Sequence, residues 1–220
     1  MKTKKNKILI IGDSLASHRD DDGYSLSTRW PGILGKNYKV KNLAKSYSTT
    51  KILKKIKKIV LKDPPDFIII QLGIVDCVPR TFSRIEFSIL FRLPKRIRLF
   101  LIKILKNIRV QSSKRAYVNP INFKKNISDF CSDIKSEIIY VKILSATNLL
   151  LLKNKNAGLS INNYNKIIEQ LSLQIDNLTF VEIKKDITTQ FTLDDGYHLN
   201  DKGHKHLSKI LDFKINEIDS

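Results

Sequence analysis

The sequence of 220 residues has little of several residue types that mark special classes of protein. Two cysteines cannot build a disulfide scaffold, and no Cys/His cluster has the spacing of a zinc site. Eight glycines and six prolines are too few for a low-complexity or collagen-like chain. No window offers the roughly 18 uncharged apolar residues that a membrane-spanning helix needs. We therefore expect a globular protein with no metal and no cofactor.

The N-terminal segment also lacks the features of a secretory signal. Its apolar run, 8–11, is shorter than the apolar region of about 7–15 residues in a signal peptide. The run ends in Gly-Asp-Ser and not in a small-residue cleavage site. Two unpaired thiols, Cys77 and Cys131, suit a reducing compartment. The sequence thus predicts a cytoplasmic protein, with peripheral contact at the inner face of the membrane left open.

Acidic residues are scarce beside basic ones, at 21 against 40, which gives a formal net charge of +19. Most of the basic residues are Lys, which favours a compositional bias spread over a solvated surface. A strongly basic chain can also bind nucleic acid or an anionic membrane. Aromatic residues interleaved with the charges are sparse, so nucleic acid is not the partner we expect.

Short apolar runs alternate with helical patterns along the whole chain. Such alternation predicts right-handed crossovers and a three-layer α/β/α sandwich around a parallel sheet, in one domain spanning 1–220 with a helical insertion at about 82–117. Ser160 and Asp201 are the predicted caps of the last two helices. The predicted strands are 7–12, 38–43, 66–72, 137–144 and 178–183, and the predicted helices include 49–61, 119–134, 163–175 and 202–218.

The loop after the first predicted strand carries Gly12-Asp13-Ser14. Ligands of parallel sheets bind beyond the carboxyl ends of the strands, so Ser14 is placed to face the crevice. If Ser14 begins a helix, its N–H is a free donor that can hold an anion. A serine nucleophile also needs a base. The alternative is that Ser14 only caps a helix.

The last loop carries Asp195 and His198, three residues apart. A single turn can bring the Asp195 carboxylate to one imidazole nitrogen, which leaves the other nitrogen free to take a proton from Ser14. The alternative is a surface loop with an incidental histidine.

The loop after the strongest predicted strand runs from Gly73 through Asp76 to Arg80. Gly73 permits a close approach of the backbone. Asp76 and Arg80 are expected at the mouth of the crevice. Arg80 either binds a polar or acidic group of the substrate or pairs with Asp76, and the sequence does not decide between the two.

These three loops together resemble the SGNH, or GDSL, hydrolase family. The matching residues are Gly12-Asp13-Ser14, Gly73-x-x-Asp76 and Asp195-x-x-His198, in the family's order and across the whole chain. The resemblance implies a flavodoxin-like sandwich and a Ser-His-Asp site that cleaves esters. Gly-Ile-Val-Asp-Cys-x-Pro-Arg at 73–80, with Trp30-Pro31, is also similar to a bacterial subset of the family associated with surface polysaccharides.

Two positions depart from the family pattern. The family's oxyanion-binding Asn is replaced by Val75, and Tyr47 occupies the position of a Gly whose N–H also points into the oxyanion hole. Loss of one such donor typically costs about 2.7–4 kcal/mol of transition-state stabilisation. Either the activity is slow or another donor substitutes. Arg80 is the first candidate for that donor, before Ser46 and Asn42.

The segment 84–115 contains ten basic residues and one acid, Glu86. Pro94 is expected to separate two helices, and the second has a broad apolar stripe with a basic rim. This pattern is typical of a helix on an anionic membrane. It is equally typical of a cap over the crevice, or of a core helix whose Lys stems reach water. We favour packing as core or cap.

The sequence therefore predicts a serine esterase or deacylase that cleaves O-acyl esters, plausibly on a bacterial surface polysaccharide or its precursor. Ser14 is the predicted nucleophile, His198 the base and Asp195 its orienting acid. Tyr47, Gly73 and Arg80 are predicted to bind the oxyanion or substrate. The alternatives are an O-acyltransferase with the same triad and a weakly catalytic binding or scaffold module.

Overall fold

The computed structural model describes residues 5–17, 25–79, 82, 84–109, 115–183 and 189–220. One sheet holds five parallel strands in the order β2-β1-β3-β4-β5. Each strand lies within a predicted apolar run, so the predicted α/β fold with its five-stranded parallel sheet is confirmed. The strands are β1 (Lys7–Gly12), β2 (Lys39–Asn42), β3 (Phe67–Gln71), β4 (Glu137–Val141) and β5 (Leu178–Val181).

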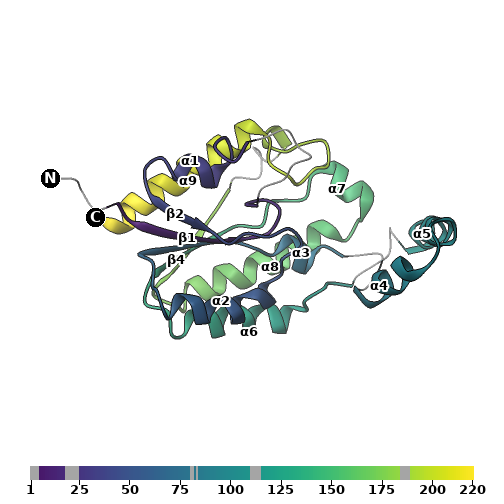
Figure 1. Ribbon diagram of the computed structural model, residues 1–220, viewed down its shortest axis with the longest axis horizontal. Helices are drawn as coiled ribbons and strands as arrows, with labels where there is room; N and C mark the ends of the chain where they lie inside the picture. The colour runs from purple at the N-terminus through teal and green to yellow at the C-terminus, as the bar shows by residue number, and fades with distance from the viewer. Residues whose placement is uncertain (1–4, 18–24, 80–81, 83, 110–114, 184–188) are drawn as a thin grey trace.

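Helices cover both faces of the sheet (Figure 1). One face packs against α1 (Trp30–Leu34) and α9 (Asp201–Asp219). The other packs against α2 (Leu53–Val60), α6 (Pro120–Cys131) and α8 (Ala157–Ser172). Successive side chains of a strand point to opposite faces, so an all-apolar strand fills both layers of core.

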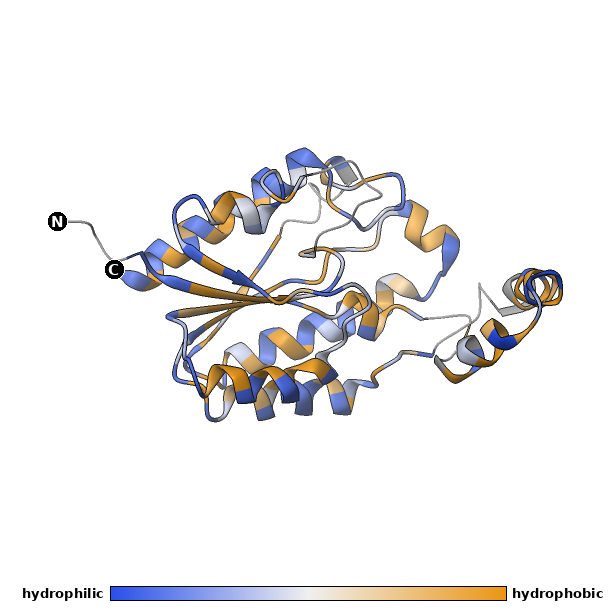
Figure 2. Cartoon of the chain, in the orientation of Figure 1, coloured by the Kyte–Doolittle hydropathy of each residue, from blue (hydrophilic) through white to orange (hydrophobic). Residues whose placement is uncertain are grey.

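Strand β1 illustrates this division of the core. Ile8 and Ile10 pack in the layer of α1 and α9, and Leu9 and Ile11 pack in the opposite layer. In Figure 2 the strands at the centre of the sandwich are mostly hydrophobic, and the helices turn hydrophilic residues outward. The continuous apolar runs in the sequence are therefore explained by burial on two sides.

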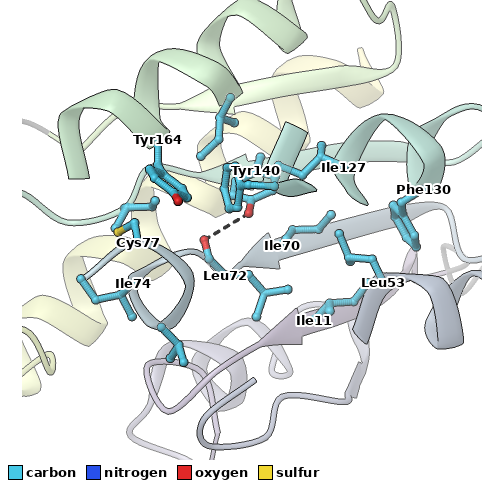
Figure 3. Packing of buried hydrophobic residues seen from close by; sticks show 14 of the residues in the cluster. Ile11, Leu53, Ile70, Leu72, Ile74, Cys77, Ile127, Phe130, Tyr140 and Tyr164 are labelled. Atoms are coloured by element: carbon cyan, nitrogen blue, oxygen red, sulfur yellow. Dashed lines mark hydrogen bonds between the residues drawn. The ribbon is translucent and has the colours of Figure 1, made fainter. Parts of the chain in front are cut away.

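One polar group inside the larger core layer is the hydroxyl of Tyr140 (Figure 3). It donates a hydrogen bond to the carbonyl oxygen of Leu72 at 3.1 Å. Burial of this side chain raises the pKa of Tyr140 well above its usual value, so the hydroxyl stays a donor. The bond links β4 to the end of β3, at the edge of the sheet formed by the carboxyl ends of the strands.

The remaining helices are short or lie outside the sandwich. Among the described residues they are α3 (Ile74–Cys77), α4 (Arg84–Arg92), α5 (Lys95–Arg109), α7 (Asn148–Lys153) and the 3-10 turns η1 (Thr50–Ile52) and η3 (Thr189–Phe191). Pro94 lies between α4 and α5, as the sequence predicts. In Figure 1 these two helices form an arm that projects away from the sandwich beyond α3.

Two predicted helix starts are wrong. Helix α8 begins at Ala157, so Ser160 lies inside it, where its hydroxyl donates to the carbonyl of Cys77 at 2.7 Å. The cap of α9 is Asn200 and not Asp201, because the Asn200 side-chain oxygen accepts the N–H of Gly203 at 2.9 Å. Both errors displace a start towards the C-terminus, since two plausible capping residues lie near each other and only backbone geometry selects one.

Candidate active site

Ser14 lies in a tight turn directly after β1. Asp13 organises this turn: its carbonyl accepts the N–H groups of Ala16 and Ser17, and its carboxylate accepts the N–H of Leu15 at 2.9 Å. Residues 14–17 form a turn and a bend and not a helix, so the predicted helix start at Ser14 is wrong. The N–H groups of Leu15, Ala16 and Ser17 donate the hydrogen bonds that close the turn. The N–H of Ser14 is not one of these donors.

The turn is also held from behind by the single tryptophan. The indole N–H of Trp30 donates to the side-chain oxygen of Gln71 at 2.9 Å and lies 3.3 Å from the carbonyl of Leu15. Trp30 is fully buried and Gln71 nearly so. Since Leu15 follows Ser14 directly, this bond restrains the backbone next to the Ser14 hydroxyl.

His198 and Asp195 lie in the loop between β5 and α9. The N–H groups of Tyr197 and His198 both donate to one Asp195 carboxylate oxygen, at 3.1 Å and 2.9 Å. The other carboxylate oxygen contacts His198 Nδ1. Gly196, with φ of 84°, allows the sharp turn, and a Cβ there would lie 2.3 Å from Thr147 Oγ1.

His198 joins the two loops, which are 184 residues apart in sequence. Its Nε2 atom lies 2.9 Å from the hydroxyl oxygen of Ser14. An ionised Asp195 only accepts hydrogen bonds, so Nδ1 carries the imidazole proton and Nε2 presents a lone pair to the Ser14 hydroxyl. Ser14, His198 and Asp195 thus form one hydrogen-bonded line with the polarity that proton removal from Ser14 requires.

The electrostatics of Asp195 favour its ionised form. Partial burial opposes ionisation, but the hydrogen bonds from the His198 ring and from the N–H groups of His198 and Tyr197 outweigh that penalty and lower the pKa of Asp195. His198 itself is buried, and its ring packs against that of Tyr197 with centroids 4.3 Å apart. The imidazole is therefore oriented from two sides.

Tyr47 lies in the loop after β2, beside the Ser14 turn. The N–H of Lys45 donates to the carbonyl of Gly12 at 3.0 Å, and Ser46 Oγ lies 3.3 Å from Ser17 Oγ. Tyr47 has a φ of 61°. It keeps the left-handed backbone that a glycine adopts easily, at a cost of roughly 1–2 kcal/mol. Tyr47 is 78% exposed, so its side chain is not packed into the core.

The backbone conformation at position 73 requires a glycine. Its φ is 127°, and a Cβ would lie 2.4 Å from the side chain of Ile143. Val75 is buried in the core with Leu72 and Ile74, so in place of the family's Asn it contributes packing. Asn42, one of the candidate substitute donors, donates instead to the carbonyl of Ala16 at 2.8 Å. Arg80, the other main candidate, lies outside the described residues.

The expected place of Asp76 at the crevice mouth is wrong. Asp76 is completely buried, and its carboxylate accepts the Thr50 N–H at 2.9 Å and the Thr50 hydroxyl at 2.6 Å. Asn126 in turn donates to Thr50 Oγ1 at 3.1 Å. This network of hydrogen bonds connects the loop after β3 to η1 and α6, and so stabilises the loop that follows β3.

Sequence reasoning missed Thr50, Gln71 and Lys153. Lys153 Nζ donates to the carbonyl of Asp195 at 3.1 Å and so restrains the loop that carries Asp195 and His198. Gln71 offered a signal, because it is the only polar residue in β3. Thr50 and Lys153 offered none. Within the described residues, no three His, Cys, Asp or Glu side chains gather closely enough to hold a metal ion.

Solved structures of similar fold share little sequence identity with this chain and include esterases. TesA is 15% identical, with a TM-score of 0.62 over 93% of this chain and 95% of that one. Esterase EstA from Pseudoalteromonas sp. is 14% identical, with a TM-score of 0.60 over 96% and 97%. The acetyl xylan esterase AlAXEase is 14% identical, with a TM-score of 0.59 over 93% and 97%.

No curated protein sequence matches the chain significantly. The model of the GDSL-like lipase/acylhydrolase family, in contrast, matches residues 10–206. That range includes both loops that meet at His198. The family model covers most of the chain, and the fold is the one that known esterases share. The chain therefore belongs to the GDSL-like lipase/acylhydrolase family.

Proposed function

We propose that the protein is a serine esterase or deacylase that cleaves O-acyl esters through Ser14, His198 and Asp195. The observation that carries this proposal is the continuous line from the Ser14 hydroxyl through His198 to Asp195. Membership of an acylhydrolase family supports the same chemistry. The depressed pKa of Asp195 supports it further, because an ionised carboxylate stabilises the imidazolium that forms during the reaction.

In the proposed reaction, the Ser14 oxygen attacks the acyl carbon while its proton passes to His198 Nε2. The tetrahedral oxyanion is held by the N–H of Ser14 and by the backbone at Tyr47. Collapse of this intermediate breaks the ester bond, and His198 returns the proton to the departing alcohol. Water, deprotonated by His198, then attacks the acyl-enzyme and releases the acid and free Ser14.

The substrate we propose is an O-acylated saccharide, on a bacterial surface polysaccharide or its precursor. The acetyl xylan esterase AlAXEase shares the fold, and its name describes a saccharide ester as substrate. The similarity of residues 73–80 to a bacterial subset of the family supports the same substrate class. Transfer of the acyl group to a sugar hydroxyl in place of water would use the same acyl-enzyme.

The test is the variant Ser14→Ala, measured with a short-chain chromogenic ester and a fluorophosphonate probe. We expect a loss of at least about 10⁴-fold in kcat, since the nucleophile is absent. Ser132→Ala, on the exposed end of α6, is the matched control and should keep wild-type turnover and labelling. Equal turnover by wild type and Ser14→Ala, or labelling of both by the probe, would contradict the proposal.

A further inference from the structure

The arm formed by α4 and α5 exposes large apolar side chains that a folded protein normally buries. Ile85 is 74% exposed and Phe100 is 63% exposed. A core position for α5, which the sequence pattern allowed, is therefore wrong. Exposed apolar patches mark surfaces that bind another molecule or a membrane. The further exposed apolar residues of the arm are Ile89, Phe91, Ile97, Leu99 and Ile104.

The arm also concentrates positive charge. Residues 84–109 contain eight Lys or Arg and one acid, Glu86, whose carboxylate lies 3.9 Å from Arg115. Lys95, Arg96 and Lys103 on α5 are exposed. The arm thus presents cations and apolar side chains together.

On α5 most side chains of the two kinds are segregated, with the exposed Leu99 as the exception on the side opposite Ile97. Ile97, Phe100 and Ile104 recur at helical spacing and share one face. Arg96 and Lys103 each precede a member of that face by one position, about 100° around the helix, so they border it. This is the order in which a helix lying on a bilayer places its residues, with apolar side chains among the acyl chains and cations at the headgroups.

We propose that the arm binds the surface of an anionic phospholipid bilayer. Charge selects this partner from the alternatives. If a second copy of the chain bound through the same arm, the eight Lys and Arg residues of one copy would lie against the eight of the other and repel them. A nucleic acid would leave the apolar face of the arm exposed to water. None of the described helices has the length and apolar character needed to cross a bilayer, so the binding is peripheral.

The arm's place in the fold gives this binding a consequence. The arm follows α3, which begins at the carboxyl end of β3, and Ser14 follows the carboxyl end of the neighbouring parallel strand β1. Figure 1 shows the arm beyond α3, on that side of the sandwich. A bilayer that holds the arm is therefore near the edge that carries Ser14. The binding itself is independent of the proposed esterase function.

The experiment is co-sedimentation of the full chain with vesicles of phosphatidylcholine alone or mixed with phosphatidylglycerol. We expect binding to the mixed vesicles that weakens as salt is added, and little binding to phosphatidylcholine. The double variant Arg96→Gln/Lys103→Gln should bind about 25-fold more weakly, at about fivefold for each cation. Phe100→Ala should lose about tenfold, because an apolar side chain no longer inserts.

Matched controls separate the arm from the general charge of the chain. Lys54→Gln/Lys55→Gln, on exposed positions of α2, removes the same charge elsewhere, and Leu173→Ala removes an apolar side chain that is 84% exposed. Both controls and Ser14→Ala should bind vesicles as the wild type does. Equal losses in the α2 control, unchanged binding by both arm variants, or no wild-type binding to mixed vesicles would overturn the proposal.

Two further outcomes would also overturn it. One is self-association in sedimentation experiments without lipid that Phe100→Ala abolishes, since a second copy would then cover the apolar face. The other is duplex DNA that binds more tightly than mixed vesicles and loses affinity only with Arg96→Gln/Lys103→Gln. Circular dichroism of each variant confirms that the helices remain.

Discussion

The loops of the candidate active site and the α4–α5 arm differ in which side chains they bury. Around Ser14, buried polar side chains make hydrogen bonds: Asp13 and Asp76 are fully buried and accept backbone N–H groups, and Trp30 donates to the side-chain oxygen of Gln71. The buried amide nitrogen of Gln71 is an exception, with no hydrogen-bond partner among the described residues. In the arm, apolar groups such as Phe100 are exposed. Each region places side chains where the general rule of burial would not put them.

This contrast indicates two kinds of function. Buried hydrogen bonds fix the active-site loops, because each polar group would lose several kcal/mol if it moved away from its partner. The arm gains nothing from exposing its apolar face to water, and this exposed face is the surface that we propose binds a bilayer. Hydrogen bonds within the fold hold the candidate site, whereas the proposed role of the arm depends on a second surface.

The largest expected effect on this comparison is a loss of catalytic activity when Asp195 is replaced. Asp195→Asn should reduce kcat/KM by about 10³–10⁴-fold, because an amide does not fix the Nδ1–H form of His198. Asp194→Asn, one residue earlier and exposed, is the control and should keep wild-type kcat/KM. Near wild-type hydrolysis of a chromogenic ester by Asp195→Asn would remove the active-site half of the comparison.

The pH dependence of the same variant carries a defined sign. Hydrogen bonds lower the pKa of Asp195 in the folded state, so its ionised form adds stability above the ordinary carboxyl pKa of about 3.9. That contribution is lost as the pH falls through the lowered pKa. The wild type should therefore exceed Asp195→Asn in unfolding free energy at neutral pH, with the difference vanishing in strong acid. Urea titrations at several pH values measure this, and a difference that grows on acidification would contradict it.

An intermediate effect is expected beneath the site, at Thr50. Thr50→Val removes the hydroxyl that donates to the buried Asp76 carboxylate and should lower the free energy of unfolding by about 2 kcal/mol. Thr50→Ser keeps the hydroxyl and should recover most of that loss. Urea denaturation distinguishes the two variants, and equal stabilities would mean that the network does not hold the loops.

The smallest effect is expected in the arm. Phe100→Ala should change the free energy of unfolding by less than about 0.5 kcal/mol, because the side chain is 63% exposed. Phe130→Ala, in the core, should cost about 3–5 kcal/mol. A comparable loss from both variants in urea denaturation would break the comparison, since the arm would then be part of the core.

Much of the fold was predictable because the strands are unambiguous. A run such as 66–72 is too short and too uniformly apolar for a surface helix, so its burial between two layers follows. Helix α7 and the start of α8 were not predicted, because Asn and Ser around 148–160 suit caps and loops as well as helix interiors. The predicted single domain, the cytoplasmic location and the polysaccharide substrate remain predictions.

The candidate site was predictable residue by residue but not in its supports. Ser14, Asp195 and His198 stand in short motifs, whereas Asp76 belongs to a motif and yet is buried beneath the site. Motif spacing gives the residue and its place in the chain, and it does not give the direction of a side chain. Tyr47 is similar: its left-handed φ is a property of the folded loop.

By itself, the sequence determined where the strands lie and which residues follow their carboxyl ends, because apolar runs and loop motifs are local properties of the chain. Only the tertiary structure decided that Ser14 meets His198 from 184 residues away and that the apolar face of α5 remains uncovered. Helical periodicity specifies a face but not its neighbour. A buried helix and a helix that binds a bilayer share the same pattern, and only packing distinguishes them.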